Sequence, residues 1–327
     1  MNTIINFLFA SIKAGVPFLY GTTGEIITQK SGSLNLGVEG MMYMGAFVGF
    51  YAGFKTESLI IALLAAFLTG VAAAFVFAFL TVTLQANQNV TGLTLTIFGG
   101  GFSVFFGEMM IKNTEGGNPK LSESLLATLA EIKMPYLSDI PYVGKMLFSH
   151  NILVYLAIFV AIICWIYLKF TKLGLKTRSV GENPAAADAS GMNVTFIKYA
   201  NIMLGGGICG LGGAYVSLIN GGGVWNNGCV NGQGWIAVAL VIFASWSPAK
   251  AIFGSLVFGM FTELQIRAND FAYEFPALGF LTDIPTAFYK MLPFIITALV
   301  LVFSSVSKKR EGNQPAACGI NYYREER

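Results

Sequence analysis

The chain carries little charge. Asp, Glu, Lys and Arg make up only 11% of its 327 residues, whereas soluble domains contain about 25%. Hydrophobic residues reach 55%, and the mean hydropathy is +0.65. This composition excludes an ordinary soluble domain and indicates a polytopic protein of the lipid bilayer. The net charge of +3 is small and gives no reason to expect a nucleic-acid partner.

Residues that carry chemistry are scarce as well. The single histidine, His150, has no partner at metal-ligand spacing, so we expect no metal or other cofactor. The four cysteines show no paired spacing. A G-x-x-x-x-G-K-[ST] motif is absent, so any ATP hydrolysis must occur on another subunit. The carboxylates in apolar segments are scattered, which argues against an intramembrane enzyme. They are Glu25, Glu39, Glu108 and Glu263.

Long apolar segments make up most of the chain. Nine of them approach the roughly 20 helical residues that a bilayer crossing needs. They are 3–28, 33–54, 57–84, 89–111, 149–170, 196–219, 234–247, 249–267 and 286–306. We therefore predict an all-α polytopic membrane fold with about nine transmembrane segments. Segment 234–247 is short, and 33–54 and 89–111 are rich in glycine or polar residues, so we expect broken or half-crossing helices there.

Basic residues predict the orientation, because short loops rich in Lys and Arg stay on the cytoplasmic side. The two most basic stretches are the loop 171–195 and the tail 308–327. Their basic residues include Lys172, Lys176, Arg178, Lys308, Lys309 and Arg310. Counting segments from these stretches places the N-terminus outside and the C-terminus inside. Residues 1–307 then form the transmembrane domain, 112–148 an extracytoplasmic loop and 308–327 a cytoplasmic tail.

The two halves of the chain resemble each other faintly. The first segment is followed by a Gly/Asn-rich break that leads into Leu34–Gly40, and segment 196–219 is followed by glycines that lead into Gly232–Trp235. By the orientation above, these two segments cross in opposite directions. Repeats of opposite topology are typical of transporters with a central solute site. We therefore expect an inverted repeat.

A compact polar helix is predicted inside the basic loop. Asn183 is a natural N-cap, Pro184 suits the first helical position, and Gly191 is placed to end the helix. About seven residues at 1.5 Å each give a helix roughly 10 Å long, too short to cross a membrane. We expect this helix to be exposed, to bury little of its surface and to bind another protein. Its residues are Glu182, Asn183, Pro184, Ala185, Ala186, Ala187, Asp188, Ser190 and Gly191.

Polar residues beside the predicted helix breaks are candidates for a solute pathway, because irregular segments at membrane depth line cavities. They are Asn35, Glu39, Gln88, Asn89, Thr91, Asn231 and Gln233. Two alternatives stay open: Glu39 could cap a helix end, and 85–92 could be a plain cytoplasmic turn. Trp225 and Trp235 are the candidates for stacking on a planar ring. The glycine runs in 205–214 indicate close helix packing.

Together, Ser31–Met42, Gly181–Met192, Gly210–Ala214 and Gly232–Trp235 resemble the permease subunits of bacterial ABC importers for branched-chain amino acids, simple sugars and nucleosides. The nucleoside-type permeases are the most similar group. That narrower match rests on Leu34–Gly40, on Ser138, Asp139, Ile140, Pro141 and Gly144, and on Asn321, Tyr322 and Tyr323. The sequence Phe243-Ala244-Ser245-Trp246 departs from the pattern, where a glycine is expected near the turn.

The resemblance implies a heteromeric importer in a bacterial cytoplasmic membrane. Two homologous permease chains would form the pathway, ABC ATPase subunits would dock inside, and an extracytoplasmic lipoprotein would deliver the solute. Pro184–Ser190 would be the coupling helix that fits a cleft in the ATPase. The alternative is a stand-alone secondary transporter driven by an ion gradient, which has no need of an exposed capped helix. Nucleosides are the first solute class that the resemblance suggests, followed by simple sugars and ring-bearing vitamins.

Overall fold

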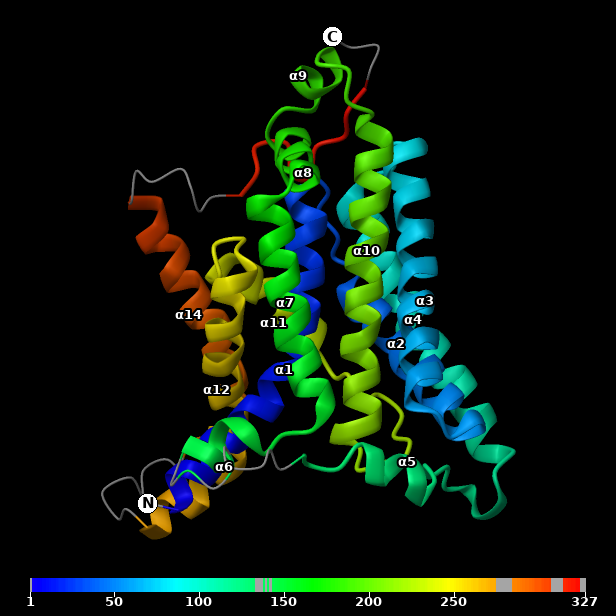
Figure 1. The fold of residues 1–327 in the computed structure, drawn as a ribbon, viewed down its shortest axis with the longest axis vertical. Helices are drawn as coiled ribbons and strands as arrows, with labels where there is room; N and C mark the ends of the chain where they lie inside the picture. Colours follow the sequence, from blue (N-terminus) through cyan, green and yellow to red (C-terminus); the bar gives the residue numbers. More distant parts are fainter. Residues whose placement is uncertain are drawn as a thin grey trace.

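The computed structural model describes residues 2–132, 138, 140, 143–274, 284–306 and 314–323. Helices dominate it, and Figure 1 shows them as an elongated bundle. The principal helices are α1 (Asn2–Lys30), α2 (Val38–Thr56), α3 (Leu59–Ala78), α4 (Gln88–Lys112), α7 (Ile152–Phe170), α10 (Val194–Tyr215), α11 (Gln233–Phe243), α12 (Pro248–Glu274) and α14 (Thr286–Val306). Short helices join them: η2 (Glu115–Gly117), α5 (Glu123–Thr128), α6 (Val143–Phe148), α8 (Lys172–Glu182) and α9 (Pro184–Ala189).

The prediction of an all-α polytopic membrane fold is confirmed. Within the described part of the chain, five helical stretches are long and apolar enough to cross a membrane: Thr3–Lys30, Leu59–Thr83, Gln88–Lys112, Ile152–Phe170 and Val194–Asn220. Large apolar side chains point outward on these helices, as a lipid-facing surface requires. Examples are Ile60, Leu68, Ile97, Phe105 and Phe159. Each of the nine predicted segments overlaps one principal helix, but the count of nine crossings is not confirmed. α11 has only 11 residues, about 16 Å of helix and half a bilayer core.

The expectation of a break within 89–111 is wrong. α4 runs without interruption from Gln88 to Lys112, and the Asn87 side chain caps it by accepting from the Val90 N–H at 3.1 Å. The glycines of this segment serve packing instead: a Cβ on Gly99 would lie 2.3 Å from the Gly40 carbonyl oxygen of α2. Because backbone approaches backbone here, α4 needs glycine without needing to unwind.

α10 is the central helix, and glycines bring its neighbours close. A Cβ on Gly70 of α3 would meet the Gly206 carbonyl oxygen at 2.2 Å, and one on Gly210 would meet the Ala66 carbonyl oxygen at 2.4 Å. These contacts also show that α3 and α10 are antiparallel. The predicted packing role of the glycines in 205–214 is therefore confirmed. Each of these two helices, α3 and α10, continues into a π-helical turn, Phe79–Thr83 and Val216–Asn220.

A tight turn after α11 reverses the chain into α12. Ser245 and Trp246 both adopt a positive φ of 52°, the conformation for which a glycine was expected. The Trp246 indole N–H donates to the Gln29 side-chain oxygen of α1, in a buried position. This anchor holds the indole ring against α1 at a turn that carries two non-glycine residues in the left-handed region.

The two ends of the bundle differ. α8, α9 and the described tail 314–323 lie together at one end, which we call the α9 end, and α1 begins at the opposite end (Figure 1). The last turn of α1 reaches the α9 end, where a Cβ on Gly181 would lie 2.3 Å from the Lys30 carbonyl oxygen. At the opposite end, the loop after α4 pairs with the loop before α11 through the Trp225 N–H and the Pro119 carbonyl at 3.0 Å.

Candidate functional site

A cavity of about 1050 Å³ lies between α1, α11, α12 and α14. Its size is at the upper end of the range for small-molecule sites, roughly 300–1000 Å³. Its polar and charged wall residues include Lys13, Asn220, Asn231, Gln233, Thr262, Glu263, Gln265, Arg267, Tyr289 and Lys290, and its aromatic wall residues include Phe9, Phe18, Trp235, Phe261 and Phe294. Aromatic rings with convergent polar groups suit a planar, hydrogen-bonding solute.

The start of α11 supplies polar groups to the cavity wall. The Gln233 side-chain oxygen is buried, and among the described residues it has no hydrogen-bond partner. Buried polar atoms are nearly always paired in folded proteins. Asn231, just before the helix, is exposed and has a positive φ of 46°. An unpaired acceptor in a cavity wall is a ready contact for a solute donor group.

Glu39 of α2 fixes this end of α11. Its two carboxylate oxygens accept from the backbone N–H groups of Gly232 at 2.7 Å and Gly234 at 2.6 Å. The adjacent Tyr43 hydroxyl accepts from the Asn231 N–H at 3.1 Å. The first N–H groups of a helix have no partner within the helix, and the positive end of its dipole favours a carboxylate. Glu39 therefore caps a half-length helix from another helix, and only 4% of its surface is exposed.

Three charged side chains of the cavity wall, Lys13, Glu263 and Arg267, are paired with a side chain of opposite charge. Glu263 and Arg267 lie one turn apart on α12, and their side chains meet at 3.1 Å. Arg267 also approaches the Asp270 carboxylate at 4.0 Å. Lys13 of α1 meets Glu131 of the loop after α5 at 3.1 Å. A wall whose charges are largely neutralised by their own neighbours favours a neutral polar solute over an ion.

A second polar cluster lies toward the α9 end. The Gln88 side-chain oxygen accepts from the Leu34 N–H at 2.7 Å, and its amide donates to the Asn321 side-chain oxygen at 2.9 Å. The Asn35 N–H donates to the Glu25 carboxylate at 3.0 Å. These groups are buried and bond to other groups of the protein, although the second oxygen of the Glu25 carboxylate has no partner among the described residues. They hold together the segment just before α2, which includes Leu34 and Asn35 and which we call the lead-in to α2, with the start of α4 and the described tail.

The predicted caps of the polar helix are confirmed in α9. The Asn183 side chain accepts from the Ala186 N–H at 3.0 Å, Pro184 occupies the first turn, and Gly191 has a positive φ of 81°. The expectation that the helix buries little is wrong at one position. Ala187 is 3% exposed and packs in a small cluster with Val180 and Val194. The remaining alanines, Ala185, Ala186 and Ala189, are exposed.

Comparison with known proteins identifies the family. Residues 8–301 match the family described as branched-chain amino acid transport system / permease component. The chain belongs to this permease family. No solved structure matches it.

Similar curated proteins cover most of the permease. The nucleoside ABC transporter permease protein NupC of Lactococcus lactis is 31% identical, with 98% of each chain covered. The guanosine ABC transporter permease protein NupQ of Bacillus subtilis is 33% identical, with 89% of each chain covered. A Haloferax volcanii protein provisionally named as a glucose ABC transporter permease, TsgC13, is 35% identical over 82% of this chain and 79% of its own. The resemblance noted in the sequence is thereby confirmed.

The permease brings some of the predicted pathway residues together and separates others. Asn231, Gln233 and Trp235 line the cavity, and Glu39 lies behind them. Gln88 and Asn35 belong to the cluster near the α9 end, and neither Asn89 nor Thr91 lines the cavity. Trp225 is 4% exposed and packs edge-on against Phe47, with ring centroids 5.5 Å apart.

Several wall residues were missed in the sequence. Lys13, Glu263, Arg267 and Tyr289 line the cavity, but only the i, i+4 spacing of Glu263 and Arg267 could have suggested a pair. Of the motif in the outer loop, Asp139 and Pro141 lie outside the described residues, as do the basic residues of the tail, 308–310. Within the described residues, no group of three His, Cys, Asp or Glu side chains is placed to hold a metal ion.

Proposed function

We propose that the chain is the membrane-spanning permease subunit of an ATP-driven ABC importer for nucleosides, with simple sugars as the second solute class. The observation that carries the solute class is the cavity at the start of α11, whose wall combines aromatic rings, amides and paired charges. Nucleosides and sugars are neutral at physiological pH and present many hydroxyl groups. The names of NupC, NupQ and TsgC13 support the same two classes.

The cavity is the proposed pathway site. The unpaired Gln233 oxygen would accept from a solute hydroxyl or amino group, and Trp235 is one of the wall rings on which a planar solute could stack. Asn231 lies beside them, and Glu39 sets their position by holding the start of α11. Asn35, Gln88, Asn89 and Thr91 stay pathway candidates for the cytoplasmic half, where the solute would leave.

The partners follow from the same proposal. ABC ATPase subunits would dock on α9, a second homologous permease would complete the pathway, and an extracytoplasmic lipoprotein would deliver the solute. The membrane is the bacterial cytoplasmic membrane, with the N-terminus outside and the C-terminus inside. The placement of basic α8 and of α9 at the end opposite the start of α1 supports this orientation (Figure 1).

The test is reconstitution of the permease with its ATPase and binding protein in lipid vesicles, followed by uptake of a radiolabelled nucleoside. Uptake should require ATP, should persist after ion gradients are dissipated, and should be reduced by unlabelled nucleoside more than by glucose. A secondary transporter would lose uptake when the gradients are dissipated. Glucose competing as well as a nucleoside would move the solute class to sugars.

Gln233→Leu tests the site itself. Because the Gln233 oxygen has no protein partner among the described residues, its removal should leave thermal stability unchanged or slightly higher. Uptake should fall about fivefold, the equivalent of about 1 kcal/mol for one hydrogen bond. Unchanged uptake with unchanged stability would remove Gln233 from the pathway.

A further inference from the structure

The described tail, Gln314–Tyr323, is attached to the body of the permease at the α9 end. The Ala317 N–H donates to the Gly181 carbonyl at 3.0 Å, and the Ala316 N–H donates to the Glu182 carboxylate at 3.4 Å. Ala317 is 8% exposed. These contacts join the first half of the tail to the end of α8, directly before α9.

Asn321 joins the tail to the other half of the bundle. Its side-chain N–H groups donate to the carbonyls of Gln85 at 2.7 Å and Ala86 at 3.1 Å, and its side-chain oxygen accepts from Gln88 at 2.9 Å. The same Gln88 side chain accepts from the Leu34 N–H at 2.7 Å. The Asn321 side chain thus pairs with two carbonyl groups of the loop before α4. Through Gln88 it is also linked to the backbone of Leu34, just before α2.

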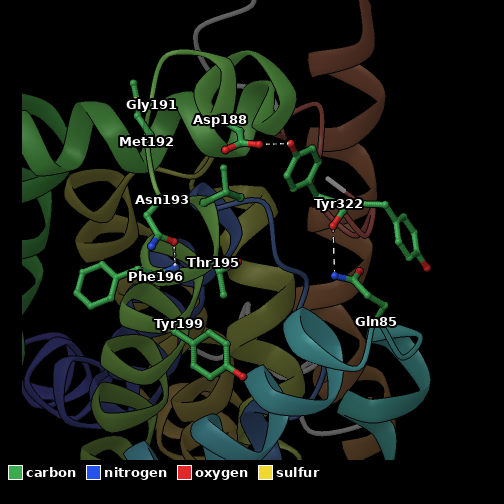
Figure 2. A pocket seen from close by; sticks show the side chains of 11 residues that line it. Gln85, Asp188, Gly191, Met192, Asn193, Thr195, Phe196, Tyr199 and Tyr322 are labelled. Carbon is green, nitrogen blue, oxygen red and sulfur yellow. Dashed lines mark hydrogen bonds between the residues drawn. The ribbon is translucent and has the colours of Figure 1, made fainter. Parts of the chain in front are cut away.

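Tyr322 joins that loop to α9. Its hydroxyl donates to the Asp188 carboxylate at 2.8 Å, and its carbonyl accepts from the Gln85 side chain at 3.2 Å. Figure 2 shows this arrangement, with Tyr322 standing between Asp188 on one side and Gln85 on the other. Tyr322 also packs in the small cluster that contains Ala187 and Val194. The next residue, Tyr323, is 46% exposed.

We infer that Gln314–Tyr323 is a strap that carries movement of α9 to the start of α4 and the lead-in to α2, through Tyr322 and Asn321. The inference rests on the proposed role of α9 as the ATPase contact. α9 and the loop 84–87 are far apart in the sequence, and Tyr322 contacts both through a side chain and a backbone group. A displacement of α9 would therefore pull on Gln85 and Asn321, and through Gln88 on Leu34. Tyr322 and Asn321 are positioning residues, because they act on the pathway through other groups.

The experiment compares Tyr322→Phe and Asn321→Ala with the matched control Tyr323→Phe in the reconstituted transporter. ATP hydrolysis and nucleoside uptake are measured on the same vesicles. Both strap variants should retain ATP hydrolysis. Tyr322→Phe loses one hydrogen bond and should use about fivefold more ATP per solute. Asn321→Ala loses three and should raise the ratio of ATP to solute at least as much. Tyr323→Phe should behave as wild type, because Tyr323 is exposed. An unchanged ratio of ATP to solute in both strap variants would overturn the inference.

A double-variant cycle tests whether Asp188 and Tyr322 act through their shared hydrogen bond. Asp188→Ala and Tyr322→Phe remove the same hydrogen bond, so the double variant should raise the ratio of ATP to solute no further than the larger single effect. Additive effects would mean that the two residues act independently and would contradict the strap. Failure of the proposed function differs from both results, because the wild-type complex itself would then show no ATP-dependent uptake, which would overturn the coupling role of the strap as well.

Discussion

Glu39 and Gly234 are 195 positions apart in the sequence, yet the carboxylate of one accepts a 2.6 Å hydrogen bond from the backbone of the other. Gly234 leaves no room for a side chain, since a Cβ there would lie 2.5 Å from the Glu39 Cα. The hydrogen bond depends on the close approach, because a larger residue at position 234 would move the backbone N–H away from the carboxylate. The start of α11, and with it one wall of the cavity, is thus fixed by α2.

Glu39→Gln should destabilise the permease and slow uptake. An amide keeps one acceptor but turns its N–H₂ group toward the other backbone donor, so one buried N–H loses its partner. The expected cost is about 2 kcal/mol, seen as a lower midpoint of thermal unfolding in detergent. Glu115→Gln is the control, because Glu115 lies on the exposed turn η2. Equal midpoints for the two variants would show that the carboxylate is not needed to hold α11.

Two glycines of α4 give a matched test of packing, because only one of them faces α2. Gly99→Ala would place a Cβ 2.3 Å from the Gly40 carbonyl oxygen, whereas a Cβ on Gly101 has no heavy atom within 4 Å. Gly99→Ala should destabilise the fold by about 1–3 kcal/mol, as overpacking does. Gly101→Ala should be neutral or stabilise α4 by up to about 1 kcal/mol through helix propensity.

The measurement is again the thermal midpoint, with expression level in the membrane as a second readout. The two substitutions add the same methyl group to the same helix, so any difference between them reports on the α2 contact. If Gly101→Ala were as damaging as Gly99→Ala, the orientation of α4 against α2 would have to differ from the one described.

Local sequence patterns predicted the parts of this permease that local physics decides. Asn183, Pro184 and Gly191 define α9 within nine residues, and each takes the predicted place in the cap, first turn or end. Apolar runs of sufficient length gave the principal helices. The half-length α11 was foreseen because 234–247 is too short to cross.

Local sequence patterns could not predict contacts between segments that are distant in the sequence. Nothing in the neighbourhood of Glu39 shows that its partners lie at the start of α11, and nothing near Gln88 points to Asn321, 233 residues away. The glycines of α4 were mistaken for a break because glycine serves both unwinding and close approach. Only the position of Gly40 on the facing helix decides between the two.

Neighbouring alanines on α9 should respond differently to the same substitution. Ala186 is exposed, so Ala186→Arg should leave folding intact but obstruct the ATPase contact that we propose. Ala187 is buried against Val180 and Val194, so Ala187→Arg would force a charge into an apolar cluster. We expect Ala186→Arg to keep the wild-type thermal midpoint while ATP hydrolysis no longer responds to solute.

Ala187→Arg should instead lower the thermal midpoint, and its loss of transport would follow from damaged structure. Measuring both quantities for both variants separates docking from folding. Normal solute-stimulated ATP hydrolysis in the Ala186→Arg complex would mean that α9 is not the ATPase contact.

The thiol of Cys318 reports whether the tail stays attached. Burial raises the pKa of Cys318 to about 11, well above the ordinary value of about 8.5. A raised pKa favours the neutral thiol, and only the thiolate is alkylated, so reaction at neutral pH should be on the order of a hundredfold slower than for a free cysteine. The rate should keep rising tenfold per pH unit beyond pH 9, where an ordinary thiol has already levelled off. Iodoacetamide labelling read by peptide mass spectrometry measures this profile separately from Cys164, Cys209 and Cys229.

Release of the tail should change that profile in a defined direction. Asn321→Ala removes the contacts with Gln85, Ala86 and Gln88, so Cys318 should become more exposed and its labelling midpoint should fall toward about 8.5. Tyr323→Phe should leave the midpoint unchanged, because the Tyr323 side chain is exposed. A wild-type profile that already levels off near pH 9 would show that the tail is detached in solution. In that case neither Asn321 nor Tyr322 could pass movement from α9 to the start of α4.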